Sequence, residues 1–110
     1  MKRMASFSFL LPFKFNDGSK IPADLFVGVR EALTDRFGGV TFQENPDNPI
    51  KGLWVSPSSG RVVSDDLMLF TVWAENVNEA RDYFEDYKGE LLKKFRQDEI
   101  KIIEQTIETF

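Results

Sequence analysis

The sequence of 110 residues contains no cysteine and no histidine. Without cysteine there can be no disulfide, no thiolate nucleophile, no iron–sulfur cluster and no thiolate zinc site. Without histidine the imidazole general base, the usual Ser–His and Cys–His couples and most transition-metal sites are excluded as well. The side chains that remain for chemistry are carboxylates, Lys, Arg, Tyr, Ser and Thr. We therefore expect no metal and no cofactor.

Long hydrophobic runs are also missing, and no segment approaches the roughly 18 residues that a membrane-spanning helix needs. The amino-terminal segment has the basic start of a secretory signal, but its serines and phenylalanines alternate and no small-residue cleavage site follows. The net charge of -4 provides little electrostatic affinity for nucleic acid. These features predict a cytoplasmic protein whose partners are neither membranes nor nucleic acids.

Phenylalanine, by contrast, is abundant, with 11 residues beside two Trp and two Tyr. Hydrophobic residues make up 42% of the chain and charged residues 29%, which is the range of globular domains. A chain of this length forms one domain around one hydrophobic core. Residues 1–110 are therefore expected to fold as a single domain.

Seven regular elements are expected, in the order strand, helix, strand, short strand, strand, helix, strand. Their predicted ranges are 6–15, 22–37, 40–43, 51–55, 61–74, 77–95 and 100–107. The strands show period-two alternation, and the first should be regular only over 6–11 because Pro12 has no N–H to donate. Two Asn-Pro pairs predict a turn-rich connector at 44–49. The run Ser64-Asp65-Asp66 is a candidate for a bulge within the strand over 61–74.

Both helices carry signals at their ends. Pro22 suits the first turn of the first helix, and Gly38-Gly39 supplies its left-handed stop. Asn76 followed by Glu79 is a capping-box pattern at the start of the second helix. Apolar residues at spacings of three and four predict one buried face on each helix.

This order of elements is that of a ferredoxin-like βαββαβ sandwich, with one additional short strand. The predicted fold class is therefore α+β, an antiparallel sheet with two helices on one face. The alternative is an open α+β sandwich with a different strand order.

Several short motifs resemble those of a known family. They are the run DRFGGVT over 35–41, Gly52-x-Trp54, the run GRVV over 60–63, Tyr87, and the closing Lys94-Phe95-x-Gln97-x-Glu99-Ile100. Within residues 30–110 the chain resembles a family of small uncharacterised bacterial ferredoxin-like domains. The resemblance implies no assigned activity, so it transfers no catalytic residue.

The strand over 67–74 is apolar on both faces, with Leu67, Leu69 and Trp73 on one and Met68, Phe70, Val72 and Ala74 on the other. The two helices can cover only one face of the sheet. A soluble monomer rarely leaves an apolar patch of that size exposed. We therefore expect a homodimer whose helix-free sheet faces pack against each other. The alternative is that the C-terminal strand or loops of the same chain cover this face.

Five residues are candidates for this interface or for an apolar ligand pocket along it: Trp54, Arg61, Phe70, Trp73 and Tyr87. Ser8 is a further polar group that such a pocket would contain. The alternative for the two Trp and for Tyr87 is ordinary hydrophobic packing.

No carboxylate pattern identifies a catalytic centre or a metal site. Asp65 and Asp66 would point to opposite faces of a regular strand, and only a bulge would bring them together. The acidic turns around Asp17 and Asp47 lack the spacing of a calcium loop, so turn chemistry is the better interpretation.

Two functions agree with these observations. The first is a non-catalytic homodimeric module that binds itself, and a small apolar ligand in addition, through the helix-free sheet face. The second is a cofactor-independent enzyme resembling small monooxygenases of the dimeric α/β-barrel type, with Tyr, Arg or Asp as working groups. The missing histidine and cysteine favour the first.

Overall fold

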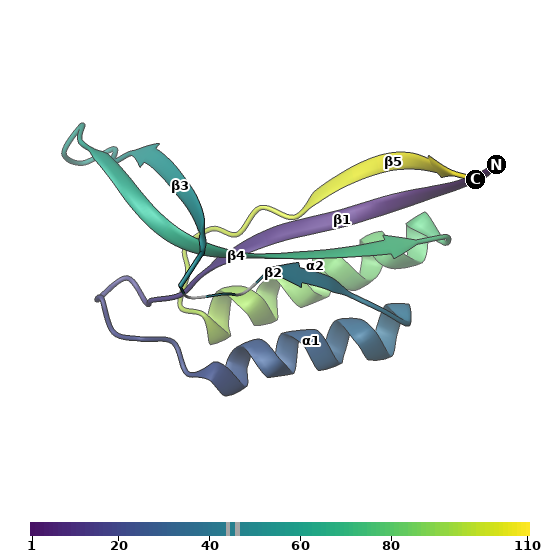
Figure 1. Ribbon diagram of the computed structural model, residues 1–110, viewed down its shortest axis with the longest axis horizontal. Helices are drawn as coiled ribbons and strands as arrows, with labels where there is room; N and C mark the ends of the chain where they lie inside the picture. Colours follow the sequence, from purple (N-terminus) through teal and green to yellow (C-terminus); the bar gives the residue numbers. More distant parts are fainter. Residues whose placement is uncertain (44, 46) are drawn as a thin grey trace.

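The computed structural model describes residues 1–43, 45 and 47–110, and Figure 1 shows two helices on one side of an antiparallel sheet. Its elements are β1 (Lys2–Pro12), α1 (Ala23–Phe37), β2 (Thr41–Gln43), β3 (Ile50–Val55), β4 (Val62–Ala74), α2 (Val77–Lys94) and β5 (Ile103–Thr109). The connector expected at 44–49 includes Glu44 and Pro46, which lie outside the described residues.

The strands follow the order β2-β4-β1-β5, and β3 also pairs with β4. β1 therefore lies between β4 and β5, as expected when two β-α-β units interleave. The predicted α+β ferredoxin-like sandwich is confirmed, and the alternative strand order is not observed. β3 is the additional strand, and it forms a hairpin with the first half of β4.

The predicted limits of β1 were wrong. The strand begins at Lys2 and continues through Pro12, because residues 2–8 pair with β5 and residues 5–12 pair with β4. Pro12 stands at the last position of the strand, opposite Leu67, where its missing N–H does not interrupt the ladder.

The candidate bulge at 64–66 is not formed. β4 is continuous because residues 62–67 pair one to one with β3. β5 begins at Ile103 rather than at 100, since Ile100 is buried and anchors the loop that precedes the strand. Local alternation did not reveal that this isoleucine belongs to the core rather than to the sheet.

The helix ends largely agree with the sequence signals. The side chain of Asn76 accepts a hydrogen bond from the N–H of Glu79 at 3.1 Å. Gly38 adopts the left-handed conformation with φ of 80°, and its N–H donates to the carbonyl of Thr34 at 2.8 Å. Pro22 occupies the cap position just before α1 rather than the first turn.

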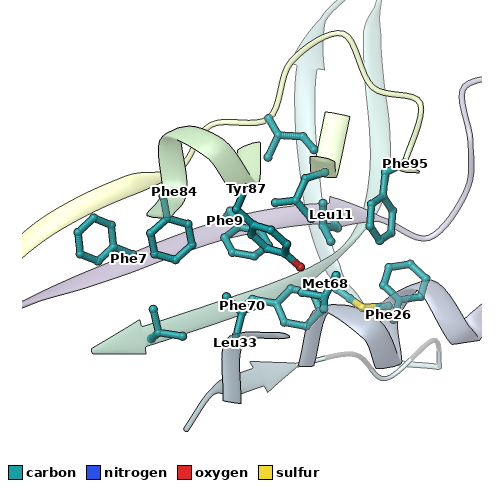
Figure 2. Close-up of a cluster of buried hydrophobic side chains, with 14 of the residues drawn as sticks. Phe7, Phe9, Leu11, Phe26, Leu33, Met68, Phe70, Phe84, Tyr87 and Phe95 are labelled. Carbon is teal, nitrogen blue, oxygen red and sulfur yellow. The ribbon is translucent and has the colours of Figure 1, made fainter. Parts of the chain in front are cut away.

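The core lies between the sheet and the helices (Figure 2). It takes the odd residues of β1 and the even residues of β4, which are Ala5, Phe7, Phe9, Leu11, Met68, Phe70, Val72 and Ala74. Phe9 and Phe70 face each other across the strands, with ring centroids 5.5 Å apart. Phe84 of α2 covers this pair and stacks on Phe7 at 5.0 Å. Most of the abundant phenylalanine is thus used in one core.

Replacing Phe70 by alanine should destabilise the fold by about 3–5 kcal/mol, because its ring is fully buried and leaves a cavity. Chemical denaturation followed by circular dichroism measures the loss. Phe42→Ala is the matched control, since this half-exposed ring lies opposite Phe70 on the edge strand β2 and should cost clearly less. Equal losses in the two variants would contradict the central place of Phe70 in the core.

Candidate interaction surface

The face of the sheet opposite the helices, the helix-free face, consists of the positions that alternate with the core. Strand pairing places on it the even residues of β1 and β3 and the odd residues of β2, β4 and β5. Four large apolar side chains there are about half exposed: Leu10 (42%), Trp54 (47%), Trp73 (48%) and Ile103 (56%). Leu69 and Ile107 contribute further, partly exposed apolar surface to the same face.

Nothing in the described chain folds over this face. The C-terminal strand β5 pairs edge to edge with β1 and therefore extends the sheet instead of covering it. The alternative, that the C-terminal strand or loops cover this face within one chain, is not observed in the described residues. The alternating pattern of β5 fits an edge strand and a covering strand equally well. Only the long-range pairing of β5 with β1 distinguishes these two positions.

In the described body of the helix-free face, strand pairing places one charged side chain, Lys2 at the start of β1, which forms an ion pair with Glu75 at 2.6 Å. The other positions carry apolar side chains and the polar residues Ser6, Ser8, Thr41, Gln43, Thr71, Gln105 and Thr109. The hydroxyls of Ser8 and Thr71 hydrogen-bond each other at 2.9 Å. One hydroxyl donates to the other, so this bond satisfies one of the two O–H donors and lowers the cost of dehydrating the pair. Depletion of charge is typical of the centre of a protein interface.

At one end the sheet continues into a hairpin of residues 50–67, the arm. Figure 1 shows that the arm rises on the side opposite the helices. The indole N–H of Trp54 donates to Oδ2 of Asp65 at 2.7 Å, which holds the ring along the inner face of the arm. The side chain of Leu67 lies over Gly52, where an added Cβ would stand 2.8 Å from Cδ1 of Leu67. The inner face is therefore closely packed at its base.

Asp65 and Asp66 do not form a carboxylate pair. Asp65 accepts the hydrogen bond of Trp54 on the inner face, while Asp66 forms an ion pair with Lys51 on the outer face. The regular strand sends the two carboxylates to opposite sides, because the candidate bulge is absent. They cannot act together as an acid and a base.

Arg61 lies at the exposed tip of the arm. Its carbonyl accepts a hydrogen bond from the N–H of Ser56 at 2.9 Å, which closes the turn. Gly60 adopts a φ of 68° just before it, a conformation that suits glycine. Arg61 is thus far from the body of the sheet.

The two tryptophans mark opposite ends of the helix-free face. Trp54 pairs with Val63, which precedes Trp73 by ten residues on β4, a separation of about 33 Å along the strand. One pocket lined by both tryptophans with Arg61 and Ser8, as the sequence suggested, is therefore not formed within a single chain.

A cavity of about 340 Å³ adjoins Trp73 at the end of the sheet opposite the arm. Its lining includes the charged side chains Arg36, Glu75 and Glu79 beside the helix cap Asn76. The cavity is therefore open to polar ligands as well as to apolar ones.

The remaining two candidates, Phe70 and Tyr87, lie in the core on the helix side of the sheet (Figure 2). Neither reaches the helix-free face. Burial raises the pKa of the Tyr87 hydroxyl, and the neighbouring Tyr83 and Glu90 raise it further. A phenol held in its protonated form is a poor general base, so Tyr87 acts in packing. Its place on the apolar stripe of α2 already indicated this.

Sequence reasoning did not single out Leu10 and Ile103 as surface residues. It also missed the ion pair between Arg81 and Glu104, whose two hydrogen bonds of 2.6 and 2.7 Å tie α2 to β5. These hydrogen bonds lower the pKa of the Glu104 carboxyl and raise that of the Arg81 guanidinium. The pair borders a second cavity, of about 300 Å³, between α2 and β5. No local sequence motif predicts this ion pair, because its two residues lie on different elements.

The described residues include no group of three or more acidic side chains placed to hold a metal ion. Neither described helix is long and apolar enough to cross a membrane.

Comparison with solved structures supports the fold. A phage SAM lyase in complex with S-methyl-5'-thioadenosine is similar to this chain with a TM-score of 0.67 and 15% sequence identity, covering 93% of this chain and 80% of that chain. At this identity the similarity shows the fold alone. No protein-family model and no curated protein matches the sequence. The resemblance to small bacterial domains therefore stays a prediction.

The environment of Tyr87 predicts a loss of stability at alkaline pH. Its pKa is raised in the folded protein, so above about pH 10, the ordinary pKa of tyrosine, the unfolded chain releases a proton that the folded chain retains. Stability should then fall as the pH rises. Tyr87→Phe should reduce this fall and change stability at pH 7 by no more than about 1 kcal/mol. Urea denaturation from pH 7 to 11 measures both, and identical pH profiles would contradict the assignment.

Proposed function

We propose that this protein is a non-catalytic homodimeric module that binds a second copy of itself through the helix-free face. The observation that carries the proposal is the character of that face, which is apolar and uncovered at its centre, with its charged side chains, Lys2 and Asp65, at the two ends. Charged residues make up 29% of the chain, so their depletion from the centre of this face is a compositional bias. Exposed apolar patches of this extent mark interaction sites.

The geometry of the face suits a symmetric contact. Leu10 and Leu69 lie opposite each other on adjacent strands at the centre of the sheet, and both point away from the helices. Two such faces related by a twofold axis place the same apolar side chains against each other. The internal hydrogen bond between Ser8 and Thr71 satisfies one of their two O–H donors, which leaves one donor for a partner across the interface.

The positions of the acid–base groups support a binding role over a catalytic one. Asp65 and Asp66 point to opposite faces, and Tyr87 is buried in the core. The ion pair on the wall of the second cavity, Arg81 with Glu104, connects two elements of the fold. A cytoplasmic location and a bacterial origin stay predictions of the sequence.

Substituting an acid into the helix-free face should abolish the dimer. Leu10→Glu and Ile103→Glu each place a charge that the contact would bury unpaired, so each should raise the dissociation constant by about 100-fold or more. Val27→Glu is the matched control, because Val27 is 37% exposed on α1, close to the 42% of Leu10, but lies on the helix side. Light scattering at micromolar concentration gives the masses.

The expected result is a dimer for the natural chain and for Val27→Glu, and monomers of 12.7 kDa for the other two. Circular dichroism shows that each variant is folded. A natural chain that is monomeric at this concentration would refute the proposal.

The alternative proposal is a cofactor-independent enzyme of the dimeric α/β-barrel type. Two observations favour it: the cavity of about 340 Å³ beside the half-exposed Trp73, and the fold shared with a lyase that was solved with S-methyl-5'-thioadenosine. A tryptophan at the edge of a cavity provides a flat apolar surface on which a planar ring can stack. S-methyl-5'-thioadenosine is therefore a suitable probe.

The two functions are separated by a thermal-shift titration of this probe on the natural chain, Trp54→Ala and Trp73→Ala. If the protein is a self-associating module, the probe leaves the melting temperature unchanged, and the substitutions weaken only the association. If the alternative holds, the probe raises the melting temperature in a saturable manner. Trp73→Ala then abolishes the shift while the dimer persists.

A further inference from the structure

The arm occupies the side of the sheet on which a second copy would have to lie. Figure 1 shows it rising away from both helices at the end of the molecule opposite to the chain termini. Its inner face is a direct continuation of the helix-free face, because β4 runs without a break from the arm into the body of the sheet. A partner that lies on the helix-free face therefore meets the arm.

Two limiting symmetric arrangements place the helix-free faces of two copies together with their strands aligned. In one, the twofold axis runs along the strands, and the two arms lie at the same end of the dimer. Both arms then rise into the same space and collide. In the other, the axis is perpendicular to the strands, and each arm rises beside the end of the partner that has no arm. Only the second arrangement accommodates two arms.

We propose that the two copies associate with antiparallel strands and that the arm of each packs against the end of the other where the chain termini lie, the armless end. This contact between the arm and the armless end is called the clasp. Trp54 of one copy then faces the end of the partner where Trp73 lies. The two tryptophans, about 33 Å apart along the strand within one chain, come together across the interface. This inference rests on the proposed self-association and adds its orientation and its contact residues.

The area of the contact supports a role for the arm. Eight paired residues on each of β1 and β4, seven on β5 and three on β2, each about 3.4 Å long and 4.8 Å wide, give the body a face of about 420 Å², or about 850 Å² for two copies. Stable interfaces bury about 1,200–2,000 Å². The six pairs of the arm add about 200 Å² per copy. The total of about 1,240 Å² reaches the lower end of the required range only when the arm takes part.

The side chains on the two faces of the arm differ in their contacts within the chain. On the outer face, Val55 and Val62 form a cross-strand pair, and both remain exposed (62% and 67%), as does Leu53 (73%). On the inner face, the ring of Trp54 is oriented by its hydrogen bond to Asp65 and is nevertheless about half exposed. A rigid, oriented tryptophan beside an apolar surface is typical of an interface anchor. The inner face is therefore the one that contacts the partner.

Because the natural chain has no cysteine, introduced cysteines give an unambiguous test. Val63→Cys lies on the inner face of the arm, and Thr109→Cys lies on the helix-free face at the armless end. Within one chain these positions stand more than about 30 Å apart, beyond the reach of a short bismaleimide. The V63C/T109C variant should therefore form covalent dimers with this reagent, whereas V63C alone and T109C alone should not.

L53C/T109C is the matched control, because Leu53 belongs to the outer face of the arm. Efficient cross-linking of V63C to itself would show the parallel arrangement, and cross-linking of L53C to T109C would show that the outer face makes the contact. Either result overturns the inference. Light scattering on the same samples distinguishes a failure of the proposed self-association from a failure of the proposed orientation. A monomer refutes the self-association itself, whereas a dimer without the link from 63 to 109 refutes only the clasp.

Discussion

The antiparallel register between β1 and β4 determines the face on which each side chain of the central sheet lies. It sets Phe9 opposite Phe70 on the helix side and Leu10 opposite Leu69 on the other. A slip of one residue would exchange the two sets, because side chains alternate along a strand. The phenylalanine core resists such a slip, since each ring stacks on a neighbour in the aligned register. The core and the helix-free face are therefore two results of one pairing.

The length of β4 explains why the surface extends beyond the body of the sheet. β1 pairs with residues 67–74 of this strand, and residues 62–67 are left to β3. A hairpin of two strands is only marginally stable by itself. Here the hydrogen bond from Trp54 to Asp65 and the packing of Leu67 over Gly52 hold it together. The same contacts leave Trp54 in place to meet another molecule, which makes the arm a natural extension of the helix-free face.

The fold class and most of the helix-end signals followed from the sequence because these signals are local. Asn76 with Glu79 and the glycine at 38 act over three or four residues, and each was found where expected. The candidate bulge at 64–66 could not be decided locally because the continuity of a strand depends on its partner, which the sequence does not identify. The five candidate interface residues lie in different parts of the structure for the same reason. Trp54 and Trp73 lie on the helix-free face and Arg61 at the tip of the arm, whereas Phe70 and Tyr87 belong to the core.

The sequence by itself determined the chemistry that is excluded, the order of the elements and the apolar character of both faces of β4. These properties depend on composition and on spacings of two to four residues, so they can be read without the fold. The tertiary structure alone decided that β5 extends the sheet instead of covering it, that the arm rises away from the helices, and that the two tryptophans lie at opposite ends. The physical reason is that strand pairing joins residues far apart in the chain. Alternation shows that a strand has two faces, but only its neighbours show what lies against each.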